Sequence, residues 1–305
     1  MRCHNRWLHL AGLVAIFLLA NAVRTQAQDP EQYLRDQYLG KTLVLRGFYS
    51  GNRLRYNASG ASDQTAAGDW TEYGFVRVEE LHSSNDRIVI QAARLAVDFI
   101  GKLFELRTLT APKGKMKPAV LKIEADFPQH NPSPEQLEAL MARIFLTDHD
   151  YFADFVPHYW RPCVRDGLAG CLEKCLFSPQ ILAVPGVAIA DPSFGADPAN
   201  ADAPVSELGP LFRVGNGVSP PRAIHAPEPE FTESARRSKF KGTVVLGLVV
   251  NKEGVPTHIH ILNPLGSGLD AEAVQAVQTW KFAPALKDGQ PVAVEIAVEV
   301  DFHLY

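Results

Sequence analysis

Two short clusters of titratable residues are the places where this sequence could carry chemistry. His258 and His260 lie two residues apart in an alternating segment, so both imidazoles leave the same face of a strand, as a metal site would require. Ile259 and Ile261 would then be the buried partners, which favours an exposed histidine pair over a metal site. Asp148-His149-Asp150 follows a predicted helix, where adjacent side chains point in different directions; this favours a polar turn over a convergent acid–base site.

The cysteines form a third candidate cluster. Cys3 lies in the N-terminal segment expected to be removed on export, which leaves Cys163, Cys171 and Cys175 as an odd set in an oxidising compartment. With His158 they could ligate zinc, but the paired C-x-x-C spacing of structural zinc sites is missing. We expect no metal, and instead one disulfide with a spare thiol. A helical CLEKC segment would place Cys171 and Cys175 too far apart to bond, so Cys163 is the expected partner of one of them.

No catalytic signature accompanies these clusters. The sequence contains no G-x-S-x-G, H-E-x-x-H or P-loop motif, so we expect no catalytic residues and no cofactor. The net charge of -4 gives no basic excess and argues against nucleic-acid binding. An enzyme activity carried by the N-terminal part of the chain is the less favoured alternative.

The N-terminus predicts export. Arg2 and Arg6 precede an apolar core, Leu10 to Val23, and Thr25-Gln26-Ala27 offers a small-x-small cleavage site. We predict a signal peptide at residues 1–27 and a periplasmic mature protein. The alternative is an uncleaved signal that anchors the protein in the inner membrane, facing the periplasm.

Residues 28–177 predict an N-terminal β-rich domain. KTLVLRGFY with RLRYNA and YGFVRVEEL with RIVIQAARLAVDF indicate two hairpins, and two more strands follow, so we expect a curled antiparallel sheet or small barrel. Ser133-Pro134-Glu135 starts a helix at 134–146. The aromatic segment from Tyr151 to Trp160 favours core packing over a ligand patch. Residues 178–221, rich in Pro, Ala and Gly, indicate a linker between domains.

Residues 222–305 predict a second domain. Strands at 242–250 and 256–262 flank an NKEG turn, and an amphipathic helix at 269–280 follows, with Ser267 or Asp270 as its cap. From Pro291 to Tyr305 apolar and polar residues alternate, which is typical of a half-buried strand. We therefore expect an α+β chain whose C-terminal domain is an antiparallel sheet packed on one main helix.

The motifs of this second domain occur in an order that resembles the C-terminal domain of TonB-family energy transducers. The motifs that carry this resemblance are Pro229-Glu230-Phe231, Ala235-Arg236, Gly242-Thr243-Val244, Glu253-Gly254, Leu269-Asp270 with Ala273, Trp280-Lys281-Phe282-Ala283-Pro284-Ala285, Asp288-Gly289 and the terminal strand. Phe231 stands where the family commonly has Tyr, and Glu253 where it has Asp. The resemblance covers about residues 227–305, a quarter of the chain, and the N-terminal domain resembles no family that we recognise.

The resemblance implies a protein that links inner-membrane motor proteins to an outer-membrane TonB-dependent receptor, by pairing a receptor strand with its sheet edge. The terminal strand is the natural edge, with Glu295, Ala297, Glu299, Asp301 and His303 as the expected partner-binding residues. The alternative is an exported module that reuses the fold to bind another envelope protein, without energy transduction.

Overall fold

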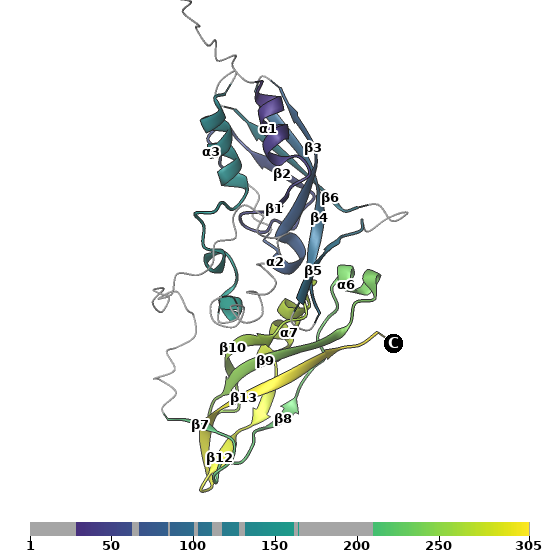
Figure 1. The fold of residues 1–305 in the computed structure, drawn as a ribbon. Helices are drawn as coiled ribbons and strands as arrows, with labels where there is room; N and C mark the ends of the chain where they lie inside the picture. Colours follow the sequence, from purple (N-terminus) through teal and green to yellow (C-terminus); the bar gives the residue numbers. More distant parts are fainter. Residues whose placement is uncertain are drawn as a thin grey trace, which may run out of the picture.

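The computed structural model describes residues 29–62, 67–84, 86–100, 103–111, 118–127, 132–161, 164 and 210–304. These residues form two lobes joined end to end (Figure 1). No helix within them is long and apolar enough to cross a membrane. The predicted signal peptide, the linker as far as residue 209, and Cys163, Cys171 and Cys175 lie outside the described residues.

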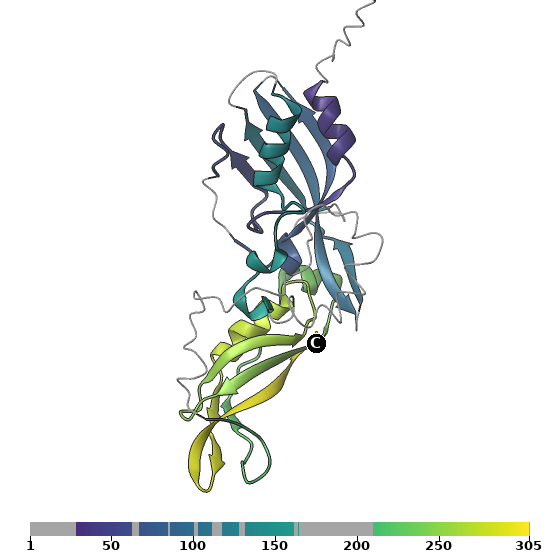
Figure 2. The same ribbon diagram turned by 60° about the vertical axis from the view of Figure 1, so that its left-hand side comes forward.

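The N-terminal lobe is built on a six-stranded mixed sheet with strand order β1-β3-β4-β6-β2, and β5 pairs with β4. Two helices, α1 and α3, lie side by side along one face of this sheet (Figures 1 and 2). The elements are α1 (Pro30–Tyr38), β1 (Thr42–Val44), β2 (Arg53–Tyr56), α2 (Trp70–Tyr73), β3 (Phe75–Ser83), β4 (Arg87–Ile100), β5 (Leu103–Thr108), β6 (Val120–Asp126), α3 (Pro134–Ile144) and the 3₁₀ turns η1 (Phe152–Asp154) and η2 (His158–Trp160).

Capping and apolar spacing explain why α3 forms where the sequence predicts it. Ser133 accepts a hydrogen bond from the Gln136 amide, the Gln136 side chain accepts one from the Ser133 amide, and Pro134 occupies the first turn. The helix buries Leu137, Leu140, Met141 and Ile144 against the sheet. Its C-terminal limit is Ile144 rather than residue 146.

The first predicted hairpin is wrong, whereas the second is confirmed by antiparallel pairing of β3 with β4. β1 and β2 end up at opposite ends of the sheet, and β2 pairs in parallel with β6. The segment between β1 and β2 contacts the residues that follow α3. Leu45 forms a β-bridge with Phe145, and the Arg46 guanidinium binds the Asp150 carboxylate at 2.6 Å. The sheet is therefore mainly antiparallel, as expected, with β2 and β6 as its parallel pair, and it is open rather than closed into a barrel.

The C-terminal lobe is a five-stranded sheet, ordered β10-β9-β13-β12, with β7 in parallel against β13. Helix α7 packs on β9 and β10. The elements are β7 (Leu211–Arg213), β8 (Arg222–His225), α6 (Glu233–Ser238), β9 (Gly242–Val250), β10 (Pro256–Asn263), α7 (Leu269–Gln278), β11 (Lys281–Ala283), β12 (Ala285–Lys287) and β13 (Gln290–Phe302). The expected α+β class holds.

Two details of this lobe correct the sequence predictions. Residues 210–221, expected to be linker, carry β7 and the buried Val218, because β7 finds ladder partners on β13. Neither Ser267 nor Asp270 caps α7: its N-cap is Gly268, at φ 76°, and the helix has no side-chain cap. Both side chains are instead turned toward the loop that precedes the helix and the N-terminal lobe.

The two lobes share one hydrophobic core. A single buried cluster includes Trp70, Phe99 and Trp160 of the N-terminal lobe together with Leu265 and Leu269 of the C-terminal lobe. Trp70 and Trp160 make an edge-to-face contact at 4.9 Å between ring centroids. The aromatic segment 151–160 therefore packs into a core, as predicted, and this core joins the lobes.

Candidate functional site

Strand β13 is paired differently along its two halves. Its first residues pair with β12 and then, from Ala293 to Glu295, with β7. On its other side it pairs with β9 from Val294 to Phe302. Among the described residues, no strand pairs with the outer side of β13 beyond Glu295. The terminal strand is thus a central strand at its start and an edge strand at its end.

The backbone direction at Ala297 follows from the neighbouring hairpin. The Asn251 amide donates to the Val255 carbonyl, so odd-numbered residues of β9 direct their amides and carbonyls toward β10. Even-numbered residues of β9 then face β13. Ala297 lies opposite the odd-numbered Gly247, within a β9–β13 register that has no shift. Its N–H and C=O therefore point away from β9, toward the open side.

The side chains predicted to bind a partner are exposed, but they do not share one environment. Glu295 lies opposite Arg213 of β7 and approaches it at 3.6 Å, so this residue belongs to the covered half of the strand. Asp301 accepts a hydrogen bond from Thr243 at 2.5 Å, and Glu299 lies between these two positions along β13. Ala297, Glu299, Asp301 and His303 remain at or beyond the open edge.

The lobe interface adds residues that the sequence analysis did not identify. The amide of Phe99 donates to the Leu265 carbonyl and the amide of Ser267 donates to the Val97 carbonyl, each at 2.8 Å. These bonds place the loop before α7 alongside the end of β4 as a short antiparallel bridge. A Cβ atom on Gly266 would lie 2.1 Å from the Val97 oxygen, so this approach requires glycine.

Charged groups fix the same loop from two sides. Asp98 is buried and accepts hydrogen bonds from Arg107, with Nε at 2.5 Å, and from the Ser267 hydroxyl. Asp270 is fully buried and accepts from the amides of Leu265 at 2.8 Å and Gly266 at 2.7 Å. The run Leu265-Gly266-Ser267-Gly268, with Asp270 two residues beyond it, is a possible sequence signal, since small residues allow close backbone approach.

Burial perturbs the acids at this interface. It raises the pKa of Asp270 to about 7, against the lowering effect of its two amide donors and with a further rise from the Asp69 carboxylate. Burial likewise raises the pKa of Asp69 and of Glu72. Perturbed acids often mark active sites, but here they lie in a packed interface, where ordinary structural burial accounts for them.

The two titratable clusters named from the sequence, His258 with His260 and Asp148-His149-Asp150, do not converge on a site in the described part of the chain. A bulge in β10 puts His258 at φ 51°, which breaks the alternation expected to align it with His260. Asp148 and His149 are exposed in a turn, while Asp150 binds Arg46. Within the described ranges, no group of three or more His, Cys, Asp or Glu side chains is placed to hold a metal ion.

Comparisons with known proteins agree with the C-terminal geometry. Residues 227–304 match the family model described as Gram-negative bacterial TonB protein C-terminal. Protein tonB2 of Pseudomonas aeruginosa is 35% identical over 82 residues, which cover 27% of this chain and 30% of that protein. Protein TonB of Vibrio cholerae is 32% identical over 78 residues, covering 25% of this chain and 32% of that protein.

The match is confined to one end of the molecule. The chain spans about a third of the length of these curated relatives. A solution NMR structure of the Pseudomonas aeruginosa TonB CTD aligns with 30% of this chain and 92% of its own, at 18% identity and a TM-score of 0.23. The family model and the two relatives identify residues 227–304 as a TonB-like C-terminal domain.

Proposed function

We propose that this protein takes part in energy-dependent transport across the outer membrane, as a TonB-like periplasmic protein that binds an outer-membrane receptor by strand addition. The observation that carries the proposal is the one-sided pairing of β13 beyond Glu295, within a domain that matches the TonB family. A short receptor segment in extended conformation would add beside the exposed backbone of Ala297 and Glu299. Backbone groups would supply most of the affinity, and side chains modest selectivity.

The carboxylates beside this edge influence which strands can pair there. Glu299 and Asp301 are exposed, and charged side chains at an edge discourage pairing with arbitrary strands. A receptor segment with basic or neutral side chains would fit beside them better than an acidic one. The proposed edge is thus protected from aggregation while it remains open to a chosen partner.

A second function has its own support. The N-terminal lobe is docked directly on the loop before α7, so the TonB-like domain is held against a second folded unit. This arrangement favours an exported envelope module in which both lobes act together, without energy transduction. Fractionation of cells discriminates the two. A protein retained in the inner membrane through residues 1–27, and co-purifying with motor proteins, supports transduction, whereas a soluble periplasmic form supports the module.

Substitutions at Ala297 test strand addition. Ala297→Pro removes an outward-facing donor from the edge and should abolish the binding of peptides taken from periplasm-facing segments of outer-membrane receptors. Ala297→Ser keeps the backbone donor and should bind as the wild type does. Circular dichroism checks that both variants are folded, and titration calorimetry measures binding. Equal binding by the two variants would exclude this edge as the binding site.

A further inference from the structure

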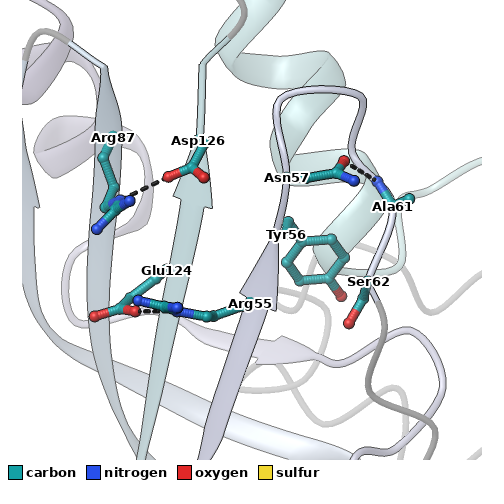
Figure 3. A pocket seen from close by; sticks show the side chains of 8 residues that line it. All are labelled: Arg55, Tyr56, Asn57, Ala61, Ser62, Arg87, Glu124 and Asp126. Atoms are coloured by element: carbon teal, nitrogen blue, oxygen red, sulfur yellow. Dashed lines mark hydrogen bonds and ion pairs between the residues drawn. The ribbon is translucent and has the colours of Figure 1, made fainter.

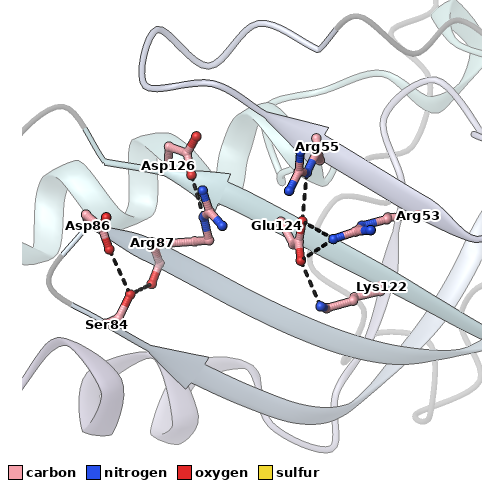
Figure 4. Close-up of polar contacts among 8 residues, drawn as sticks. All are labelled: Arg53, Arg55, Ser84, Asp86, Arg87, Lys122, Glu124 and Asp126. Carbon is pink, nitrogen blue, oxygen red and sulfur yellow. Dashed lines mark hydrogen bonds and ion pairs between the residues drawn. The ribbon is translucent and has the colours of Figure 1, made fainter.

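The open face of the N-terminal sheet carries a cluster of cations around one carboxylate (Figure 4). Glu124 of β6 accepts from Arg53 Nη2 at 3.0 Å through both of its oxygens, and from Arg55 Nε at 2.8 Å. Lys122 Nζ lies 2.7 Å from its Oε1 atom. Three cations thus converge on one anion, which leaves an excess of positive charge.

Register explains why these side chains meet. β2 runs parallel to β6, with Arg53 opposite Lys122 and Arg55 opposite Glu124, so all four side chains leave the same face. The Glu124 side chain is 6% exposed, whereas those of Arg53, Arg55 and Lys122 are 53%, 54% and 43% exposed. The carboxylate is therefore enclosed beneath the cations, which still face solvent.

Glu124 leaves much of the donor capacity of the cations unused. A guanidinium has five N–H donors and an ammonium has three. The bonds to Glu124 engage Nη2 of Arg53 and Nε of Arg55. The hydrogen bonds from the three cations lower the pKa of Glu124, so the carboxylate stays charged and keeps the cationic groups in place. A second anion would meet donors whose positions are already fixed, and fixed donors reduce the entropic cost of binding.

A pocket adjoins this cluster (Figure 3). Its volume is about 360 Å³, and its lining residues are Arg55, Tyr56, Asn57, Ala61, Ser62, Arg87, Glu124 and Asp126. Small-molecule sites fall in this size range. The pocket therefore offers space for the body of a small ligand beside the cationic cluster.

The net charge differs from one end of this sheet face to the other, and this difference indicates where an anion would bind. Arg87 Nε binds Asp126 at 2.6 Å, which makes that pair neutral, and Asp86 lies beyond it, bound to Ser84 (Figure 4). The excess positive charge is thus confined to the Glu124 end. Guanidinium groups match the oxygen geometry of phosphate through paired N–H donors, better than they match a monovalent halide.

We propose that Arg53, Arg55 and Lys122 form a binding site for a phosphomonoester, with the phosphate on these three cations and the rest of the ligand in the adjoining pocket. The site lies on the N-terminal lobe, away from β13, so it would give this lobe a ligand of its own. The same chemistry is offered by a free small phosphate compound and by the headgroup of phosphatidic acid.

Inorganic phosphate is the first probe, titrated calorimetrically into the full chain at constant ionic strength. We expect saturable binding that Arg53→Gln/Arg55→Gln weakens by at least about tenfold. Arg77→Gln is the matched control, because Arg77 also binds a carboxylate, Glu79, through Nε at 2.9 Å and is 42% exposed. Unaltered affinity of the double variant, or no saturable binding to either phosphate or phosphatidic acid vesicles, would overturn the proposal.

Vesicles distinguish the two sources of the phosphate. Binding to vesicles with phosphatidic acid, but not to vesicles of phosphatidylcholine alone, would assign a lipid headgroup, provided that Arg53→Gln/Arg55→Gln abolishes it. Binding of inorganic phosphate without vesicle binding would assign a soluble ligand. Vesicle binding that persists in the double variant would show general surface attraction and would contradict the site. Arg53→Lys/Arg55→Lys keeps the charge and should restore part of the affinity, which separates loss of the site from misfolding.

Discussion

Gly266 should hold the two lobes together, and Gly266→Ala tests this directly. Gly266 has φ 94°, and a Cβ atom there would lie 2.1 Å from the Val97 oxygen and 2.9 Å from the Asp98 Cα atom. Backbone atoms cannot yield as a flexible side chain can. The loop before α7 must therefore move away from β4, which separates the two hydrogen bonds of the bridge, Phe99 to Leu265 and Ser267 to Val97.

The expected loss of stability in Gly266→Ala follows from the broken hydrogen bonds and the strained backbone. Two hydrogen bonds contribute about 0.5–1.5 kcal/mol each. A non-glycine residue at positive φ costs about 1–2 kcal/mol more. The free energy of unfolding should fall by about 2–5 kcal/mol in Gly266→Ala, by adding these terms. Gly289→Ala is the control, because Gly289 has φ 77° and a Cβ there would meet nothing within 4 Å. It should lose only the conformational part, about 1–2 kcal/mol.

Guanidinium unfolding followed by tryptophan fluorescence and by far-ultraviolet circular dichroism measures both variants. Trp70 and Trp160 are 2% and 0% exposed in the shared core, so fluorescence reports on the interface. In Gly266→Ala the fluorescence transition should move to lower denaturant and separate from the dichroism transition. A loss of stability no larger than that of Gly289→Ala would refute the role of the bridge.

Three further predictions concern acids, export and cysteines. Because burial raises the pKa of Asp270 to about 7, from an ordinary 3.8, the native state holds a proton that the unfolded state releases, and the unfolding free energy should decline as pH rises from about 4 to 7. Asp270→Asn should reduce that slope in pH-dependent denaturation, and an unchanged slope would assign it to other groups. The intact mass of the periplasmic protein should correspond to a chain that begins at Gln28. A mass that includes residues 1–27 would instead support an uncleaved membrane anchor. Non-reducing peptide mapping should find Cys163 bonded to Cys171 or Cys175, and a Cys171–Cys175 bond would contradict this.

Local patterns predicted the C-terminal lobe well. β9, β10, α7 and β13 are each visible as alternation or helical spacing. β9 and β10 are antiparallel neighbours joined by a short turn, and β13 pairs with the other side of β9. The binding edge expected on β13 stays a prediction, and the described part of the chain leaves the outer side of β13 unpaired beyond Glu295. The covering of its first half by β7 was missed, because β7 is three residues long and its partner lies about eighty residues further along the chain.

The N-terminal lobe exposes the limits of local reasoning. The sequence favoured a β1–β2 hairpin, yet the parallel β2–β6 pairing depends on contacts about seventy residues apart. Helix α1 could have been found: Asp29 caps it by accepting from the Glu31 amide, and Pro30 stands at its first position. The cation cluster around Glu124 could not be predicted from the sequence. The alternating Arg53 and Arg55 predict an exposed face of a strand, but they do not say which strand pairs with it.

The lobe interface and the proposed binding edge are connected by a short series of contacts. Phe302, the last residue of β13, packs edge-on against Phe231 at 5.4 Å between ring centroids. Thr232, which follows Phe231, donates a hydrogen bond from its hydroxyl to the Ser267 carbonyl at 2.8 Å, and the Ser267 amide donates to the Val97 carbonyl. A partner strand added beside the end of β13 would therefore lie close to the residues that join the lobes. Under the proposed function, the N-terminal lobe is placed to respond when the TonB-like domain engages its partner.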